Sequence, residues 1–298
     1  MVQKHRGVVR PPRLNMPPPT YGDLGKSARN IFGTGFHFGL LKLDVKTKTN
    51  SGVEFSAGEV ANQDTGKVFG TLESKYKVKE YGLTFVEKWN TDNTLGVDVT
   101  LVDKPLKGLT LGYSSTFSPQ TGKRSGKLKS IYQHDNVAVT SDFDLSLSAG
   151  PLINASAVVG YQGWLAGYQA GFDSQTSKVT KNNFALGFHA SDFHIHAAVE
   201  NGREFGGSIF HKIKPGLDGA INLAWNSSNN VTQFGLGSSY KLDEDVCVRA
   251  KINSQLQIGL GYQQKLRSGV SLCLSTNIDG KNFGSGGHKI GFALNLEA

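Results

Sequence analysis

The chain of 298 residues has a net charge of +8, a hydrophobic fraction of 38% and a mean hydropathy of -0.28. No stretch approaches the roughly 18 consecutive apolar residues that a membrane-crossing helix needs, so the composition excludes a helical membrane protein. A membrane β-barrel is not excluded, because half of each of its strands faces water. The two cysteines, Cys247 and Cys273, are too few for a disulfide framework in a chain of this length.

The first segment, residues 1–19, is a basic and proline-rich extension that we expect to be disordered. Its basic residues are Lys4, Arg6, Arg10 and Arg13, with no acidic residue among them. A solvated tail is the simplest interpretation, and binding of nucleic acid or anionic lipid is the alternative. No apolar segment follows the basic start, so we expect no secretory signal peptide.

The second segment, residues 20–32, predicts an amphipathic helix with Thr20 as its N-cap. Polar side chains lie opposite an apolar stripe formed by Tyr21, Leu24, Ala28, Ile31 and Phe32. The third segment, residues 33–39, contains Gly33, Gly35 and Gly39 and predicts a flexible hinge, because glycine adopts backbone conformations that other residues avoid.

From residue 40 to the C-terminus at residue 298 the chain repeats one unit, a hairpin with one apolar and one polar face. Residues 81–101 are the clearest copy, since two arms of alternating polarity flank a turn at residues 90–93. Arms of about eight to eleven residues recur roughly every fourteen residues, which gives about eighteen to twenty strands. The alternation alone does not decide whether their number is odd or even.

These arms favour an all-β transmembrane barrel. A soluble sandwich or propeller is the alternative, but its strands are usually about five or six residues long, whereas about nine to eleven residues suit a tilted membrane crossing. Closure would remove the sheet edges, and so many strands would enclose a water-filled channel lined by the polar faces.

Several strings of residues closely resemble the voltage-dependent anion channels, the mitochondrial members of the eukaryotic porin family. They are PPTYGDLGKSAR at 18–29, KLD at 42–44, EYGLTF at 80–85, EKWNTDNTLG at 87–96, GWLAGYQ at 163–169, EFGGSI at 204–209 and DGKN at 279–282. The resemblance runs from about residue 18 to residue 298, so only the basic extension lies outside it.

The resemblance implies a barrel of nineteen strands in the mitochondrial outer membrane, with parallel first and last strands and the N-terminal helix inside the pore. It implies a voltage-gated, weakly anion-selective channel for ATP, ADP, phosphate and small ions, with no enzymatic activity and no cofactor. Hexokinase and cell-death regulators are the implied partners, and a homo-oligomer is an expected assembly. The alternative is an outer-membrane scaffold that docks kinases or cell-death regulators and for which transport is secondary.

The side chains that would set anion preference are cations on the helix and on the polar strand faces. Cations in a pore raise the local anion concentration, but salt screens them within roughly 8 to 10 Å, so the preference should be mild. We expect them to be Lys26, Arg29, Lys42, Lys46, Lys48, Lys75 and Lys77. Gating would involve the helix and its glycine hinge, or deformation of the wall.

The resemblance also suggests nucleotide contacts at Lys26, Gly259, Gly261 and Asp279. Two lysines that are common in the family are absent, since Thr34 and Thr110 stand in their places. These replacements weaken the prediction of a defined nucleotide site without affecting permeation.

Glu87 shares a strand face with Leu83, Phe85 and Trp89, so in a barrel it would point at lipid, where a charge is costly. We expect a regulatory role, because the corresponding glutamate of the family is associated with wall dynamics, calcium sensitivity and hexokinase docking. The simpler alternative is a hydrated position near the membrane interface.

Two other motifs are weaker. Gly25-Lys26-Ser27 ends like a phosphate-binding loop, but the required first glycine and the preceding strand are missing. His194 and His196 share a strand face near His189, yet no cysteine or carboxylate at suitable spacing completes a metal site. We therefore expect histidines that face the lumen, and no metal.

Overall fold

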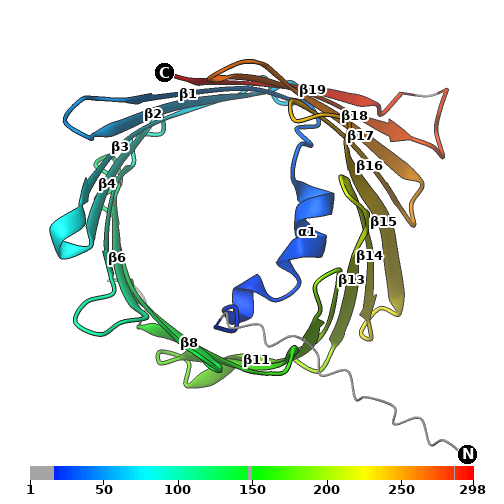
Figure 1. The fold of residues 1–298 in the computed structure, drawn as a ribbon. Helices are drawn as coiled ribbons and strands as arrows, with labels where there is room; N and C mark the ends of the chain where they lie inside the picture. Colours follow the sequence, from blue (N-terminus) through cyan, green and yellow to red (C-terminus); the bar gives the residue numbers. More distant parts are fainter. Residues whose placement is uncertain (1–16, 147–149, 285) are drawn as a thin grey trace, which may run out of the picture.

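The computed structural model describes residues 17–146, 150–284 and 286–298. Nineteen β-strands form one closed sheet around a central lumen, and a helical segment lies inside that lumen (Figure 1). The predicted all-β barrel of about nineteen strands with an internal N-terminal helix is thus confirmed. Most of the predicted basic extension, residues 1–16, lies outside the described residues.

The strands follow one another along the chain with short connections. Their bounds are β1 Leu40–Lys48, β2 Glu54–Asn62, β3 Val68–Val78, β4 Leu83–Asn90, β5 Leu95–Val102, β6 Leu109–Phe117, β7 Arg124–His134, β8 Val137–Ser146, β9 Leu152–Tyr161, β10 Trp164–Asp173, β11 Lys178–His189, β12 Phe193–Glu200, β13 Glu204–Lys214, β14 Leu217–Asn226, β15 Val231–Lys241, β16 Val246–Asn253, β17 Gln257–Arg267, β18 Val270–Asp279 and β19 Lys289–Glu297.

Neighbouring strands along the chain pair antiparallel, and the barrel closes where β1 pairs with β19. This closing pair is parallel, with Leu41 opposite Phe292 and Lys46 opposite Glu297. The parallel closing pair follows from the odd number of strands. Each hairpin reverses the direction of the chain, so the first and nineteenth strands run in the same direction. Closure leaves the sheet with no unpaired edge.

The two faces of the sheet differ as the alternation predicts. Large apolar side chains on the outer face stay exposed, including Leu41 at 45%, Phe85 at 40% and Trp89 at 51%. An outer surface covered by such side chains is unsuited to water and suited to hydrocarbon. Inside, polar and small side chains line the lumen, except where the helical segment packs on the wall.

Two strand boundaries differ from the predicted arms. Tyr81 lies in a 3-10 turn, η2 (Lys79–Tyr81), and β4 begins only at Leu83. The turn is closed by Gly82 at φ +66, where an added Cβ would lie 2.5 Å from the carbonyl oxygen of Val102. Leu256, within the repeat of alternating arms expected from residue 40 onward, has φ +60 and lies in the turn before β17.

The predicted single helix is divided into two pieces, a 3-10 turn η1 (Tyr21–Asp23) and an α-helix α1 (Lys26–Gly33). Gly25 separates them with φ +70. Thr20 does not cap a backbone N–H as expected, because its hydroxyl donates instead to the carboxylate of Asp23 at 2.8 Å. Within the described ranges no helix is long and apolar enough to cross a membrane.

Candidate permeation pathway

The 3-10 turn η1 docks on the inner wall of the barrel through one buried leucine. Leu24 is 1% exposed and packs in a cluster with Ala138, Val158, Leu165 and Ala185. The wall makes room for it, since a Cβ added at Gly167 would lie 3.0 Å from the Leu24 side chain. The start of the internal segment is therefore fixed by apolar packing to β8–β11.

The helix α1 docks further round the barrel, on β13, β14 and β15 (Figure 1). Ala28 and Ile31 are buried against Phe210 and Ala220, with Phe32 beside them. A Cβ at Gly237 would come within 2.9 Å of Ile31. The predicted apolar stripe thus faces the wall, and the polar side of the helix faces the open part of the lumen.

Histidines on the inner face meet the start of α1. Ser27 Oγ lies 2.9 Å from Nδ1 of His194, whose ring stacks on His189 with centroids 4.3 Å apart. Gly25 passes so close to His196 that an added Cβ would lie 2.9 Å from its Nδ1. The described residues contain no group of three or more His, Cys, Asp or Glu that could hold a metal ion. These lumen-facing histidines position the helix.

The hinge is held to the inner faces of β16 and β18 by side chains that bond its backbone. Arg249 Nη1 donates to the carbonyl oxygen of Thr34 at 3.1 Å, and Lys251 Nζ donates to that of Phe32 at 2.6 Å. Ser275 Oγ accepts a hydrogen bond from the backbone N–H of His37 at 2.9 Å. The Sγ of Cys273 lies 3.4 Å from the carbonyl oxygen of Gly35.

Aromatic residues of the hinge cover the ammonium group of Lys251, which lies 4.0 Å from the ring centroid of Phe36 and 5.0 Å from that of Phe38. Two of the predicted hinge glycines, Gly35 and Gly39, have φ of +79 and +72, and the third, Gly33, is the last residue of α1. The hinge is therefore an ordered segment with specific anchors on the wall.

Two titratable groups of the internal segment have lowered pKa values. The pKa of the Asp23 carboxyl is lowered, chiefly by the hydrogen bond from Lys26 and also by that from Thr20, against an opposing effect of burial. The pKa of His37 in the hinge is lowered mainly by burial and further by the charge of Lys42, while Asp44 opposes the shift. Asp23 is thus held ionised and His37 is held neutral.

The predicted pore cations lie on the lumen side, and most have a carboxylate partner. Lys26 pairs with Asp23 at 3.0 Å, Lys42 with Asp44 at 2.8 Å, and both Lys48 and Lys75 with Glu54 at 3.4 and 3.7 Å. Arg29 bonds the carbonyl oxygens of Gly22 and Leu24. Lys46 and Lys77 have no carboxylate within 4.0 Å among the described residues. Lys46 lies opposite Glu297 in the sheet. Lys77 lies close enough to Glu54 for their charges to interact.

The structure does not bring the four predicted nucleotide contacts together. Gly259 and Gly261 face the hinge, where added Cβ atoms would lie 2.8 Å from Phe38 and from the carbonyl oxygen of Gly35. Lys26 lies at the other end of the internal segment, next to the residue that meets β12. Asp279 ends β18 and accepts hydrogen bonds from the backbone N–H groups of Lys281 and Asn282.

Glu87 lies on the outer face of β4, as the alternation predicts. Its neighbours in register are Ser74 and Val97, and no described cation lies within the 4.0 Å of an ion pair. A second outward-facing carboxylate, which was not predicted from the sequence, is Glu59 of β2. It lies opposite the outward-facing Leu43 and level with the β4–β5 turn. If the outward face of β2 is followed at every second residue from Phe55, it reaches Glu59, so the sequence pattern held the signal.

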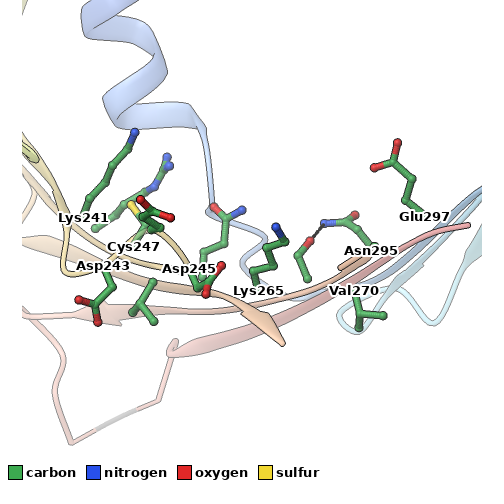
Figure 2. Close-up of a pocket in the computed structure, with 14 residues that line it drawn as sticks. Lys241, Asp243, Asp245, Cys247, Lys265, Val270, Asn295 and Glu297 are labelled. Atoms are coloured by element: carbon green, nitrogen blue, oxygen red, sulfur yellow. Dashed lines mark hydrogen bonds between the residues drawn. The ribbon is translucent and has the colours of Figure 1, made fainter. Parts of the chain in front are cut away.

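A cavity of about 400 Å³ opens on the inner side of β15–β19, at the end of the barrel where the β15–β16 turn lies. Figure 2 shows Lys241 extending toward α1, Lys265 and Asn295 lining the floor, and Asp243 pointing the other way. Asn295 donates to Ser271 Oγ at 3.2 Å. Arg249 also lines this cavity, which connects the hinge anchor with the mouth of the lumen.

Arg249 and Lys251 are the main residues of the site that were not predicted from the sequence. Both alternate with apolar residues in β16, which marked them as facing the lumen. Their role could not be read from that pattern, because it depends on the hinge lying against β16 and β17, which are more than 200 positions away in the sequence.

Comparison with known proteins agrees with this architecture. The voltage-dependent anion-selective channel of Drosophila melanogaster is 58% identical over 283 residues, covering 95% of this chain and 100% of that relative. The non-selective voltage-gated ion channel VDAC2 of Homo sapiens is 56% identical over 281 residues, covering 94% of this chain and 95% of that relative. A mutant porin of Rhodopseudomonas blastica gives a TM-score of 0.48 at 12% identity, over 76% of this chain and 96% of that chain, which is too distant to add to the argument.

The model of the eukaryotic porin family matches residues 17–291, nearly all of the part that folds into the barrel. Both the sequence identity and this match extend over the helix, the hinge and the strands. The chain belongs to the eukaryotic porin family.

Proposed function

We propose that this protein is a voltage-gated, weakly anion-selective channel through which ions and metabolites such as ATP, ADP and phosphate diffuse across the mitochondrial outer membrane. The observation that carries the proposal is the closed nineteen-strand barrel whose apolar face is outside and whose polar face surrounds the lumen. An interior of this width is not filled by its own side chains, so water and small solutes can pass. The protein is a channel and not an enzyme.

Weak selectivity follows from the balance of charge along the lumen. The lysines of β1 and β3 raise the anion concentration, but carboxylates beside most of them cancel much of the field. The names of the relatives differ in the selectivity they state, since the fly protein is called anion-selective and the human VDAC2 is called non-selective. We expect a small preference for anions in this chain, with Lys26, Arg29, Lys42, Lys46, Lys48, Lys75 and Lys77 among the lining cations.

Gating in this proposal uses the internal segment. Residues 20–32 carry charge inside the lumen, residues 33–39 connect them to β1, and the hinge anchors are a few hydrogen bonds that can break and re-form. Voltage acting on Lys26 and Arg29 would shift the balance between docked and undocked segments, which would change the free cross-section.

Recording from planar bilayers tests the proposal. The purified chain should give stepwise conductance that falls at higher voltages of either sign, and a salt gradient should give a reversal potential of the sign expected for chloride preference. A chain that remains soluble in plain buffer and leaves liposomes impermeable to small anions would refute it. Import into isolated mitochondria, followed by protease protection, tests the location, and a chain recovered in the matrix would contradict it.

The outer face favours one second candidate function, docking of a kinase or a cell-death regulator, because Glu87 places a carboxylate among apolar side chains on the outer wall. Poor conductance together with pull-down of hexokinase by the reconstituted barrel, lost on Glu87→Gln, would favour this scaffold role. Normal conductance without docking would leave the channel as the function.

A further inference from the structure

The fixed positive charge of the lumen is distributed unevenly around the barrel. On β1–β8 most inward-facing lysines have a carboxylate within 4.0 Å or directly opposite in the sheet, and the carboxylate of Glu54 is close enough to Lys77 for their charges to interact. The closest pairs are Lys42–Asp44 and Lys88–Asp98, both at 2.8 Å, and Lys127 lies 4.0 Å from Asp142. The remaining lysine of β7, Lys129, lies directly opposite Asp142 in the sheet.

The surroundings of β16 contrast with this wall. Arg249 lies opposite Ser239 and Gly261, and Lys251 lies opposite Gly237 and Gly259, so none of their direct neighbours carries a negative charge. No described carboxylate lies within 4.0 Å of either cation. The nearest carboxylate in the same row is Asp218 of β14, beyond Ser239 and therefore two strands or about 10 Å away, and Asp218 itself lies opposite Lys212.

The partners of these two cations neutralise them only in part. Both donate to backbone carbonyls at the C-terminal end of α1, which carries a partial charge of about minus one half. That fraction offsets only part of two full positive charges. Asp243, Glu244, Asp245 and Glu297 line the same cavity as Arg249, but none of them lies within the 4.0 Å of an ion pair, so a local excess of positive charge remains. The helix adds no negative charge, because α1 contains Lys26 and Arg29 and no acidic residue.

Screening makes this difference matter for a passing ion. At physiological ionic strength charges are felt over about 8 Å, so a lysine paired at 3 to 4 Å acts on a distant ion only as a weak dipole. An unpaired cation acts over the full screening distance. The anion preference should therefore come from the wall that carries unpaired charge.

We propose that Arg249, with Lys251 beside it, is the principal selectivity-determining residue of this pore, and that the anion path runs along the β14–β18 side of the lumen and not along the lysines of β1 and β3. The inference rests on the proposed channel function and identifies which charges give it its preference. Permeant anions of any chemistry, chloride or the phosphates of a nucleotide, would meet the same field.

The test is the reversal potential of single channels in a potassium chloride gradient. The Arg249→Gln channel should lose much of the wild-type chloride preference, and the Arg249→Gln, Lys251→Gln double variant should lose most of it, with reversal potentials moving toward zero or changing sign. Arg249→Lys should keep the wild-type value, because it keeps the charge. The loss should be larger at low salt, where screening is weaker.

Two controls separate charge from structure. The double variant Lys88→Gln, Asp98→Asn removes a paired cation together with its carboxylate, so it should leave the reversal potential unchanged. Ser275→Ala removes an anchor of the hinge without changing any charge, so it should alter hinge mobility and not selectivity.

The results distinguish the inference from the function on which it rests. A wild-type channel without chloride preference would refute the anion selectivity itself. A selective wild type whose preference survives in the Arg249→Gln, Lys251→Gln channel, or is lost equally in Ser275→Ala, would overturn the role assigned to Arg249.

Discussion

At the scale of single residues, the carboxylates on the outer face carry a cost that the barrel otherwise avoids. Glu87 lies between Phe85 and Trp89 along β4, and its neighbours across the sheet cannot neutralise it. A charge in hydrocarbon costs on the order of 2 kcal/mol near the bilayer centre and much less near the interface. We propose that the same residue destabilises the wall and makes it locally more mobile.

Replacing Glu87 with Gln should raise the free energy of unfolding in lipid by about 1–2 kcal/mol and reduce the motion of β4, while leaving conductance intact. Relaxation NMR of β3–β5 amides and denaturant unfolding in bilayers measure the two effects. Glu59→Gln is the matched control. Glu59 lies level with the β4–β5 turn, so its replacement should raise the free energy of unfolding by less. Unchanged mobility in Glu87→Gln would contradict the interpretation.

His37 makes the docking of the hinge depend on pH. Burial and Lys42 lower its pKa in the docked hinge, so the undocked hinge, with a pKa nearer the ordinary 6.5, binds a proton more readily. Docking is therefore strongest above about pH 6.5 and weakens as the pH falls from there through the lowered pKa of the docked form.

A spin label at position 34 in a cysteine-free chain should become more mobile between about pH 7.5 and pH 5. His37→Gln should remove that dependence, because glutamine does not titrate. Equal pH dependence in the two chains would show that other groups, such as the lumen histidines, control the hinge.

At the scale of elements, the hinge lies in a track of glycines on the inner wall. Gly261 faces the carbonyl oxygen of Gly35, and a Cβ added there would come within 2.8 Å of it. Gly291 of β19 lies even closer to the hinge, against the carbonyl oxygen of His37. Backbone oxygen is not a flexible group, so even a methyl group must move the hinge away from the wall.

Gly261→Ala should therefore loosen the hinge and leave the barrel folded. Hydrogen exchange of the amides of residues 33–39 should become faster by at least several-fold, while exchange in the strands stays slow. Gly112→Ala in β6 is the control, because the nearest atom to its added Cβ is 3.8 Å away. Protected hinge amides in Gly261→Ala would show that the hinge is held in some other way.

The elements also differ in how far their structure could be predicted from local sequence. The stripe from Tyr21 to Phe32 predicted which helix face is buried, because amphipathic period depends on local sequence. The break at Gly25 has no room for a side chain, because His196 and Ser208 lie against it, and these residues come close only in the folded barrel. Likewise the pairing of Lys42 with Asp44 could be suspected from their spacing, whereas that of Lys75 with Glu54 required the register of β2 and β3.

At the scale of the whole molecule, alternation over most of the chain favoured a membrane barrel and left a soluble all-β fold as the alternative, and the resemblance decided between them. Alternation did not determine the parity of the strands, which the resemblance supplied and the parallel β1–β19 pair confirmed. Nor did it show that the charge of the lumen is balanced on β1–β8 and unbalanced on β16, because balance depends on neighbours across the sheet.

The central claim is that alternate residues of each strand face water and lipid in a membrane, and accessibility along β3 tests it most directly. Single cysteines from residue 71 to residue 76, in a chain with Cys247 and Cys273 replaced, are exposed to a charged, membrane-impermeant thiol reagent during bilayer recording. Thr71→Cys, Glu73→Cys and Lys75→Cys should react and reduce the conductance, whereas Leu72→Cys, Ser74→Cys and Tyr76→Cys should not. Reaction without a period of two, or reaction that leaves the current unchanged at every position, would contradict the barrel and its water-filled lumen.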